Sequence, residues 1–181
     1  EDRVQAHVFL CMLAYLVERL ERCEALGPIV IATSERNDDD RIEAFCQAKG
    51  IACHRGALDD VAGRLIGAAR AFDFECFVRV NGDSPLLDPE LVSTGIGLMV
   101  GGEWDLVTNL LPRSYPKGQS VEVIRRRALE EAHGRMTTDD EREHVTKFIY
   151  AHASEFRIRN FPAPAPAAKV QLSVDDKMDF E

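Results

Sequence analysis

The stretch that decides the fold is Val78-Arg79-Val80-Asn81-Gly82-Asp83-Ser84-Pro85-Leu86-Leu87-Asp88-Pro89-Glu90-Leu91. Its first residues continue an apolar, β-branched run that is typical of a buried strand, and Asn81-Gly82 ends that run with turn residues. Asp88 followed by Pro89 predicts the N-cap and first position of a helix. Asp83 therefore lies between a strand end and a helix start, where ligands bind in open α/β sheets. From these residues alone, Asp83 is either a turn residue or an oxygen ligand for magnesium.

The composition is that of an ordinary globular domain. The chain has 181 residues, of which 45% are hydrophobic and 29% charged, so we expect a single domain over residues 1–181. Its net charge of −9 argues against a nucleic-acid or anionic membrane partner. The five cysteines form no C-x-x-C pair, and the sequence shows neither a membrane-spanning stretch nor a signal-peptide pattern. These features predict a cytoplasmic protein whose cysteines are free and packed as small apolar residues.

Strand and helix patterns alternate through the first half of the chain. We expect helices at 12–25, 38–49, 60–72 and 89–100, and strands at 29–33, 51–54 and 74–80. In the second half, strands are expected at 105–109, 121–124, 157–161 and 170–174, and a capping box at 138–141 opens a further helix. Residues 1–11 fit either a strand or a helix. In the 60–72 helix, the inward positions are expected to be Val61, Leu65, Ala68 and Phe72. The order of elements predicts a three-layer α/β/α sandwich around a mainly parallel mixed sheet.

A second carboxylate, Asp175, follows the last expected strand as Asp83 follows the central one. Two aspartates at neighbouring strand ends would make a two-point magnesium site, with the remaining positions left to phosphate and water. In that arrangement their carboxylate oxygens would lie within about 4–6 Å of each other. The alternative is that Asp175 or Asp176 caps a following helix.

Six segments, in the same order, resemble a cytidylyltransferase family that includes spore-coat polysaccharide biosynthesis proteins and CMP-sugar synthetases. The most informative is R-V-N-G-D-S-P-L-L-D-P-E-L-V at residues 79–92, and the closing L-S-V-D-D-K-M-D-F-E resembles the family's last motif. The other four are I-V-I-A-T-S (29–34), H-R-G-A-L-D-D-V (54–61), Y-P-K-G-Q-S-V-E-V (115–123) and E-R-E-H-V-T (141–146). Together the matches extend over residues 12–181.

The resemblance implies a Rossmann-like nucleotide-diphospho-sugar transferase fold of the GT-A type. It also implies a magnesium-dependent reaction of CTP with a sugar or sugar acid, giving a CMP-sugar and pyrophosphate for surface polysaccharides such as the spore coat. In this interpretation Asp83 and Asp175 are the catalytic, metal-binding carboxylates. The nucleotide would lie at Asn81, Gly82, Arg55, Asp60 and Ser34, and the sugar at Tyr115, Lys117, Gly118, Glu122, Glu143 and His144. A homodimer is left open.

Several alternatives to these assignments stay open. Glu122 is alternatively an edge-strand carboxylate in water, His144 a partly buried helix histidine bonded to a neighbour, and Arg55 a surface ion pair. A GT-A glycosyltransferase is a second candidate function, although Gly-Asp-Ser-Pro-Leu stands where that class has a D-x-D motif. A third candidate is a non-catalytic relative that binds a nucleotide weakly or packs against a partner chain.

One departure from the family pattern generates a prediction. The family opens with a loop of the form A-R-x-x-S-x-R-L-P-G-K that cradles the triphosphate, and residues 1–11 do not match it; nor does a counterpart of the family's last helix follow Glu181. We therefore expect a truncated or diverged member. Because CTP carries about four negative charges, a metal held by two carboxylates leaves the site net negative, so CTP binding should be weak and turnover near background.

Release of pyrophosphate from CTP in the presence of magnesium and 2-keto sugar acids measures this turnover. A rate of about 1 per second or more would contradict the expectation. A longer chain that carries the phosphate loop should restore both binding and turnover.

Overall fold

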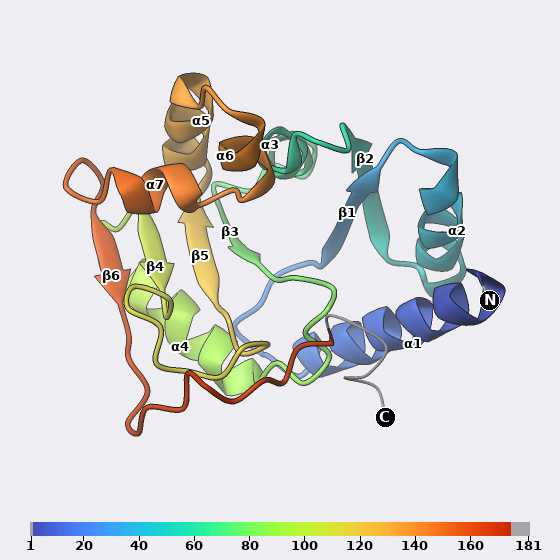
Figure 1. The fold of residues 1–181 in the computed structure, drawn as a ribbon, viewed down its shortest axis with the longest axis horizontal. Coiled ribbons are helices and arrows are strands. Elements are labelled where there is room, and N and C mark those ends of the chain that lie inside the picture. The colour runs from blue at the N-terminus through green and yellow to red at the C-terminus, as the bar shows by residue number, and fades with distance from the viewer. Residues whose placement is uncertain (1, 175–181) are drawn as a thin grey trace. The chain divides into compact units, whose positions relative to one another are not determined.

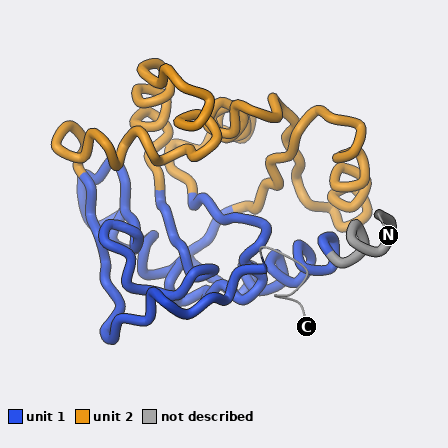
Figure 2. Tube along the Cα trace, in the orientation of Figure 1, with its two compact units in different colours: residues 1–27, 78–123, 158–181 blue, residues 28–77, 124–157 orange. Residues whose placement is uncertain are grey.

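The computed structural model describes residues 2–174 and shows a mixed α/β fold (Figure 1). The chain divides into two compact units (Figure 2). Unit 1 comprises residues 1–27, 78–123 and 158–181, and unit 2 comprises residues 28–77 and 124–157. Within the described residues, no helix has the length and apolar composition needed to cross a membrane. All five cysteines are free as expected, but Cys11 is exposed, and only Cys23 and Cys46 are fully buried.

Unit 1 contains most of a four-stranded sheet. The first residues of β3 (Cys76–Arg79) and the last residues of β5 (Glu122–Arg125) are assigned to unit 2. The strand order is β3–β5–β4–β6, and β4 and β6 pair in parallel. Strand β4 is buried along its whole length, which places the core of the unit at this strand. The elements are α1 (Asp2–Leu20), β3 (Cys76–Arg79), α4 (Pro89–Val100), β4 (Leu106–Thr108), β5 (Glu122–Arg125) and β6 (Ile158–Asn160).

Helix α1 resolves the ambiguity of the first residues in favour of a helix. Its buried residues Leu13, Leu16, Val17 and Leu20 follow helical spacing. The predicted range of 12–25 is wrong at both ends, because the helix begins at Asp2 and ends at Leu20. The Glu21 amide still bonds four residues back, but the amides of Arg22 and Cys23 bond three residues back, which tightens the last turn and ends the helix.

Helix α4 begins and ends where the sequence predicts. The Asp88 carboxylate accepts a hydrogen bond from the Glu90 amide at 2.9 Å, and Pro89 occupies the first turn. The helix packs closely on the residues at the start of β5, because a Cβ atom at Gly95 would lie 3.0 Å from methyl groups of Val121 and Val123. Residues 80–88, which join β3 to α4 and are called the signature loop below, are therefore fixed at both ends by these two elements.

Unit 2 contains a two-stranded parallel sheet with helices packed on it. The register runs from the pair Val30–Ala52 to the pair Ser34–Gly56. Helix α3 packs on both strands and on α5. The elements are β1 (Val30–Ser34), a 3-10 helix (Asn37–Asp39), α2 (Asp40–Lys49), β2 (Ala52–Gly56), α3 (Val61–Ala71), α5 (Arg126–Arg135), α6 (Asp139–Glu143) and α7 (Lys147–Ala151).

Two helices of unit 2 differ from the sequence analysis. In α3 the buried residues are Ala62, Ile66, Ala68 and Ala69. Ala68 is therefore inward as predicted, whereas Val61 and Leu65 are only half-buried and the prediction for Phe72 is wrong, because that ring is 38% exposed. Helix α5 was not predicted, because its buried residues are only two alanines and one leucine within a strongly charged segment.

Residues 170–174, expected as the last strand, form backbone bonds without a regular strand. The Lys117 amide donates to the Val170 carbonyl, and the Leu172 amide donates to the Lys117 carbonyl, both at 2.9 Å. An isolated parallel bridge joins Lys117 and Gln171. Gly118 has a φ of +85°, and a Cβ there would lie 2.5 Å from the backbone of Leu172 and Ser173. This segment therefore requires a glycine at position 118.

We predict that Gly118→Ala lowers the free energy of unfolding by about 2–3 kcal/mol, because the left-handed conformation and the backbone clash both disfavour alanine. Urea unfolding followed by circular dichroism measures the change. Gly97→Ala is the matched control, since it lies inside α4 with no atom within 4 Å of the added Cβ and should stabilise by up to about 1 kcal/mol. Equal unfolding midpoints for Gly118→Ala and the wild type would contradict the prediction.

Candidate functional site

The signature loop of unit 1 follows β3, which ends at Arg79, and it contains Asp83. The loop turns through bonds from the Ser84 amide to the Asn81 carbonyl and from the Leu87 amide to the Ser84 carbonyl. Oδ1 of Asp83 accepts a hydrogen bond from the Ser84 hydroxyl at 2.8 Å. Asp83 is half-buried, and no ion pair among the described residues involves it. Its carboxylate is therefore available to a bound cation.

Asp175, the second predicted metal ligand, lies outside the described residues, so its distance from Asp83 stays a prediction. The structure does describe the preceding residue, Val174, whose amide donates to the Asp83 carbonyl oxygen at 2.8 Å. The backbone leading to Asp175 therefore lies against the signature loop. Among the described residues, no group of three or more His, Cys, Asp or Glu side chains forms a metal cluster.

Gln119 holds the far side of the same loop, and the sequence analysis did not identify it. Its side chain is 7% exposed; Oε1 accepts from the Asp88 amide at 3.0 Å, and Nε2 donates to the Leu86 carbonyl at 2.7 Å. Arg19 of α1 also donates to this backbone, from Nε to the Leu87 carbonyl at 3.0 Å. In the segment Y-P-K-G-Q-S, no local pattern distinguishes a glutamine that makes these two bonds, called the Gln119 clamp below, from a glutamine at the surface.

The residues predicted for the sugar in unit 1 differ in exposure. Lys117 is exposed, and Tyr115 is half-buried with its ring 6.2 Å from that of Phe161. Glu122 is 2% exposed, and its carboxylate accepts a 2.6 Å hydrogen bond from Arg79. The edge-strand alternative for Glu122 is therefore wrong, because β5 lies between β3 and β4. Its role toward the sugar stays a prediction.

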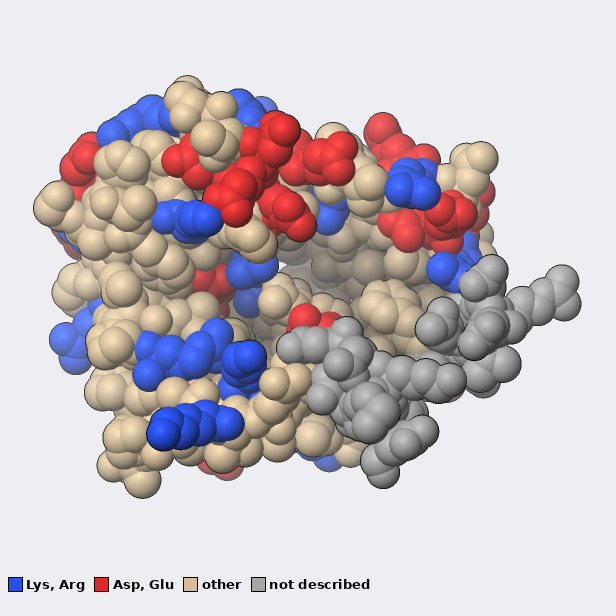
Figure 3. Space-filling model, viewed as in Figure 1, with Lys and Arg blue, Asp and Glu red and all other residues tan. Residues whose placement is uncertain are grey.

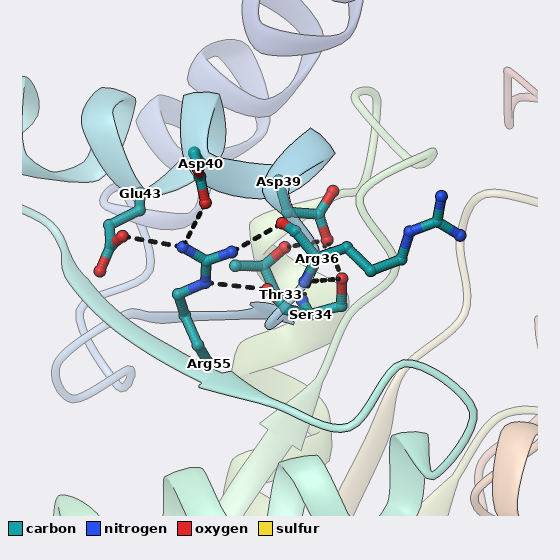
Figure 4. A network of polar contacts seen from close by, with 7 residues as sticks. All are labelled: Thr33, Ser34, Arg36, Asp39, Asp40, Glu43 and Arg55. Atoms are coloured by element: carbon teal, nitrogen blue, oxygen red, sulfur yellow. Dashed lines mark hydrogen bonds and ion pairs between the residues drawn. The ribbon is translucent and has the colours of Figure 1, made fainter.

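In unit 2, Ser34 belongs to a network at the carboxyl end of β1 (Figure 4). One oxygen of Asp39 accepts from the Thr33 hydroxyl at 2.9 Å, the Ser34 amide at 3.0 Å and the Ser34 hydroxyl at 2.5 Å. Burial raises the pKa of Asp39, but these hydrogen bonds outweigh it and hold the pKa below the usual aspartate value. The ionised carboxylate therefore fixes the end of β1.

Arg55 belongs to the same network. Its Nε donates to the Ser34 carbonyl at 2.9 Å, Nη2 donates to the Arg36 carbonyl at 2.7 Å, and Nη1 contacts Asp40 at 2.6 Å and Glu43 at 3.0 Å. The hydrogen bond to Asp40 contributes most to raising the pKa of Arg55. The ion-pair alternative therefore describes the arrangement seen here, and contact with the nucleotide stays a prediction.

Glu143 and His144 are both exposed at the end of α6. Thr138 and Glu141 form the predicted capping box, but the helix ends after five residues, and Val145 has a φ of +36°. His144 is 60% exposed, with Nε2 3.5 Å from Asp140, so the partly buried alternative is wrong. The third predicted nucleotide residue of this unit, Asp60, caps α3 by accepting from the Gly63 amide at 2.8 Å.

Charge is unevenly distributed over the surface. On the face drawn in Figure 3, acidic side chains gather over the helices of unit 2, whereas Lys and Arg side chains form a group over unit 1. The net charge of −9 is therefore not spread uniformly over this face, and unit 1 presents a locally positive surface there.

The fold is an α/β fold of the Rossmann-like type, in which ligands bind at the loops that follow the strands. Comparison with known proteins identifies the family, because the family model described as "Cytidylyltransferase" matches residues 10–178. The chain belongs to the cytidylyltransferase family, as its sequence motifs predict.

The relatives agree with this assignment. An uncharacterized protein of Methanocaldococcus jannaschii is 30% identical over 94% of this chain and 70% of its own length. The spore coat polysaccharide biosynthesis protein SpsF of Bacillus subtilis is 30% identical over 84% of this chain and 64% of its own length. Among solved structures, a cytidylyltransferase from Leptospira borgpetersenii has a TM-score of 0.90 at 26% identity, covering 94% of this chain and 72% of that one. The predicted α/β class of the fold is confirmed.

We predict that Asp39→Asn destabilises the protein by about 1–2 kcal/mol at neutral pH, because the neutral amide accepts these hydrogen bonds less strongly. The folded-state pKa of Asp39 lies below the unfolded value, so its contribution exists above the unfolded pKa and is lost as the pH falls through the folded pKa.

The difference from the wild type should therefore shrink below about pH 4, as measured by urea unfolding across pH. Asp38→Asn is the control, since that side chain is 70% exposed and pairs with Arg36 at the surface. A destabilisation by Asp39→Asn that is as large at pH 3 as at pH 7 would show that the charge of Asp39 is not responsible.

Proposed function

We propose that this protein transfers the cytidylyl group of CTP to a sugar or sugar acid, forming a CMP-sugar and pyrophosphate for surface polysaccharide biosynthesis. The observation that carries the proposal is the family match over residues 10–178. Two relatives add to it: SpsF, and a 3-deoxy-manno-octulosonate cytidylyltransferase of Anaeromyxobacter dehalogenans that is 31% identical over 86% of this chain. Because 3-deoxy-manno-octulosonate is a 2-keto sugar acid, the second relative favours an acceptor of this class.

The reaction requires positioning and charge neutralisation rather than covalent catalysis. A sugar hydroxyl oxygen forms a bond to the α-phosphorus of CTP, the bond from that phosphorus to the bridging oxygen breaks, and pyrophosphate leaves while the hydroxyl loses its proton. The protein must hold the attacking oxygen in line and stabilise the negative charge on the phosphates.

Asp83 and Asp175 are the residues that we propose to hold magnesium. Carboxylate oxygens suit this hard cation, Asp83 has no described cationic partner, and the backbone bond from Val174 brings the second segment to the first. When bound, the ion neutralises phosphate charge and orients the triphosphate. The loop that carries Asp83 is held by Gln119, which limits how far the carboxylate can move.

The remaining roles follow the position of each residue. Ser34 and Arg55 are proposed for the nucleotide because Ser34 ends β1 and Arg55, from the neighbouring β2, donates to its carbonyl. Lys117, exposed beside the fixed Gly118, is proposed to attract an anionic sugar. In this arrangement Glu122 acts through Arg79 by fixing the strand that leads to Asn81.

Asp83→Asn tests the proposal, because it keeps the shape of the side chain and removes its charge. Magnesium-dependent CTP binding, followed by calorimetry, should weaken by at least about tenfold, while the free energy of unfolding should change by less than about 1 kcal/mol. Asp73→Asn is the control, since that side chain is 98% exposed at a positive φ that asparagine tolerates.

Binding that survives Asp83→Asn while stability collapses would mean that Asp83 is a structural turn residue. The acceptor class is tested by pyrophosphate release with CTP and 2-keto sugar acids. Transfer from a sugar nucleotide without pyrophosphate release would instead favour the glycosyltransferase.

A further inference from the structure

Three arginines among the described side chains of unit 1 are half-buried, and their guanidinium groups differ in what they contact. Arg79 pairs with the Glu122 carboxylate at 2.6 Å. Arg19 donates from Nε to a backbone carbonyl of the signature loop at 3.0 Å. The guanidinium group of Arg113 makes one hydrogen bond to the described residues, a long one of 3.4 Å from Nη1 to the Pro116 carbonyl, and it forms no ion pair with them. Of these three charges, that of Arg113 is therefore the least compensated.

Most N–H donors of Arg113 stay available to a ligand. A guanidinium group carries its donors in a planar fork, and Arg113 uses one of them on Pro116. Within the described part of the chain, Nε of Arg64 is the one side-chain nitrogen or oxygen that is buried without a partner, so the other nitrogen atoms of Arg113 reach the solvent. A half-buried charge loses part of its hydration, which a bound anion replaces. The fork matches a carboxylate, because the two form parallel hydrogen bonds.

The backbone beside Arg113 is held by a segment that is distant in the sequence. The Ser114 hydroxyl accepts a hydrogen bond from the Ala163 amide at 2.8 Å, and the Ala167 amide donates to the Ser114 carbonyl at 2.7 Å. The bond of Nη1 within the same turn orients the guanidinium group. Residues 113–118, called the 113–118 turn below, therefore present Arg113 from a fixed backbone.

The 113–118 turn lies beside the loop that carries Asp83. The Leu172 amide donates to the Lys117 carbonyl at 2.9 Å, and the Val174 amide donates to the Asp83 carbonyl at 2.8 Å. Because two residues of chain span at most about 7 Å, the carbonyl oxygens of Lys117 and Asp83 lie within about 13 Å of each other. The Gln119 clamp joins the end of the turn to the signature loop a second time. The turn and the loop are therefore close enough for one sugar acid to contact both.

We propose that Arg113 binds the carboxylate of the acceptor and thereby selects a sugar acid over a neutral sugar. The inference rests on the proposed function and assigns a specificity-determining residue to its acceptor site. Lys117 is exposed and attracts the anion from solution, whereas the planar fork of Arg113 fixes the orientation of the carboxylate. The motif Y-P-K-G-Q-S-V-E-V begins two residues after Arg113, so the sequence analysis did not include this arginine.

The test is the binding of a sugar acid and of its neutral ester to the full chain, measured by calorimetry. The probes are 3-deoxy-manno-octulosonate and its methyl ester. Both are titrated with magnesium and a CTP analogue that has a methylene group between its α- and β-phosphorus atoms, so that no pyrophosphate leaves.

Arg113→Gln should weaken binding of the acid by about ten- to a hundredfold, because it removes a charge-assisted contact, and should leave binding of the ester unchanged. Arg113→Lys should recover part of the affinity for the acid, since it keeps the charge without the fork. Arg159→Gln is the matched control. It removes the same charge from an exposed arginine of unit 1, whose Cζ lies 6.0 Å from the centre of the Trp104 ring, and should leave the ratio of acid to ester affinity unchanged.

A preference for the acid that is lost in Arg113→Gln and kept in Arg159→Gln would establish the role of Arg113. An undiminished affinity of Arg113→Gln for the acid would overturn the inference while leaving the proposed function intact. An equal loss for acid and ester would also overturn it, because Arg113 would then be a structural residue of the turn. If the wild type binds neither the CTP analogue nor the acid, the proposed function is contradicted, and the inference with it.

Discussion

The buried ion pair between Arg79 and Glu122 is the interaction on which the signature loop depends. The Glu122 carboxylate is almost fully buried, and a buried charge without its partner would cost several kcal/mol. The pair therefore fixes how β3 lies against β5. Because only Val80 separates Arg79 from Asn81, Gly82 and Asp83, the same contact fixes the point from which this loop leaves the sheet. The Gln119 clamp then fixes the far end of the loop.

Elements with local signals were predictable from the sequence. Helix α4 has an N-cap, a first-turn proline and glycines at its end, and each acts within a few residues along the chain. Helix α2 ends at Gly50 in the left-handed conformation, and the capping box at Thr138 is present as predicted. Such signals need no knowledge of tertiary contacts. Helix α5 lacks such signals, and its short apolar face is recognised only from the tertiary structure, in which it packs on α3 and α7.

The sequence motifs identified most of the candidate site residues, but they did not predict which protein groups surround them. The motifs identified Arg55, Asp60 and Glu122, yet each of these charged groups already has protein partners from distant parts of the sequence. The partner of Glu122 lies 43 residues away, and that of Asp60 lies 73 residues away. No spacing rule within one segment could indicate these pairs. Gln119 was missed for the same reason, and so was His133, whose Nε2 lies 2.8 Å from Oδ2 of Asp60.

The segment before Asp175 is held to the rest of unit 1 by peptide groups. The amides of Leu172 and Val174 donate to the carbonyls of Lys117 and Asp83, and the amide of Lys117 donates to the carbonyl of Val170. Bonds of this kind are indifferent to side-chain identity, except where proline removes a donor. Substitutions other than proline at Val170, which is 49% exposed, should therefore leave the path of the chain unchanged. The exposed side chains of this segment can thus change during evolution while the backbone bonds that hold Val174 against Asp83 are kept.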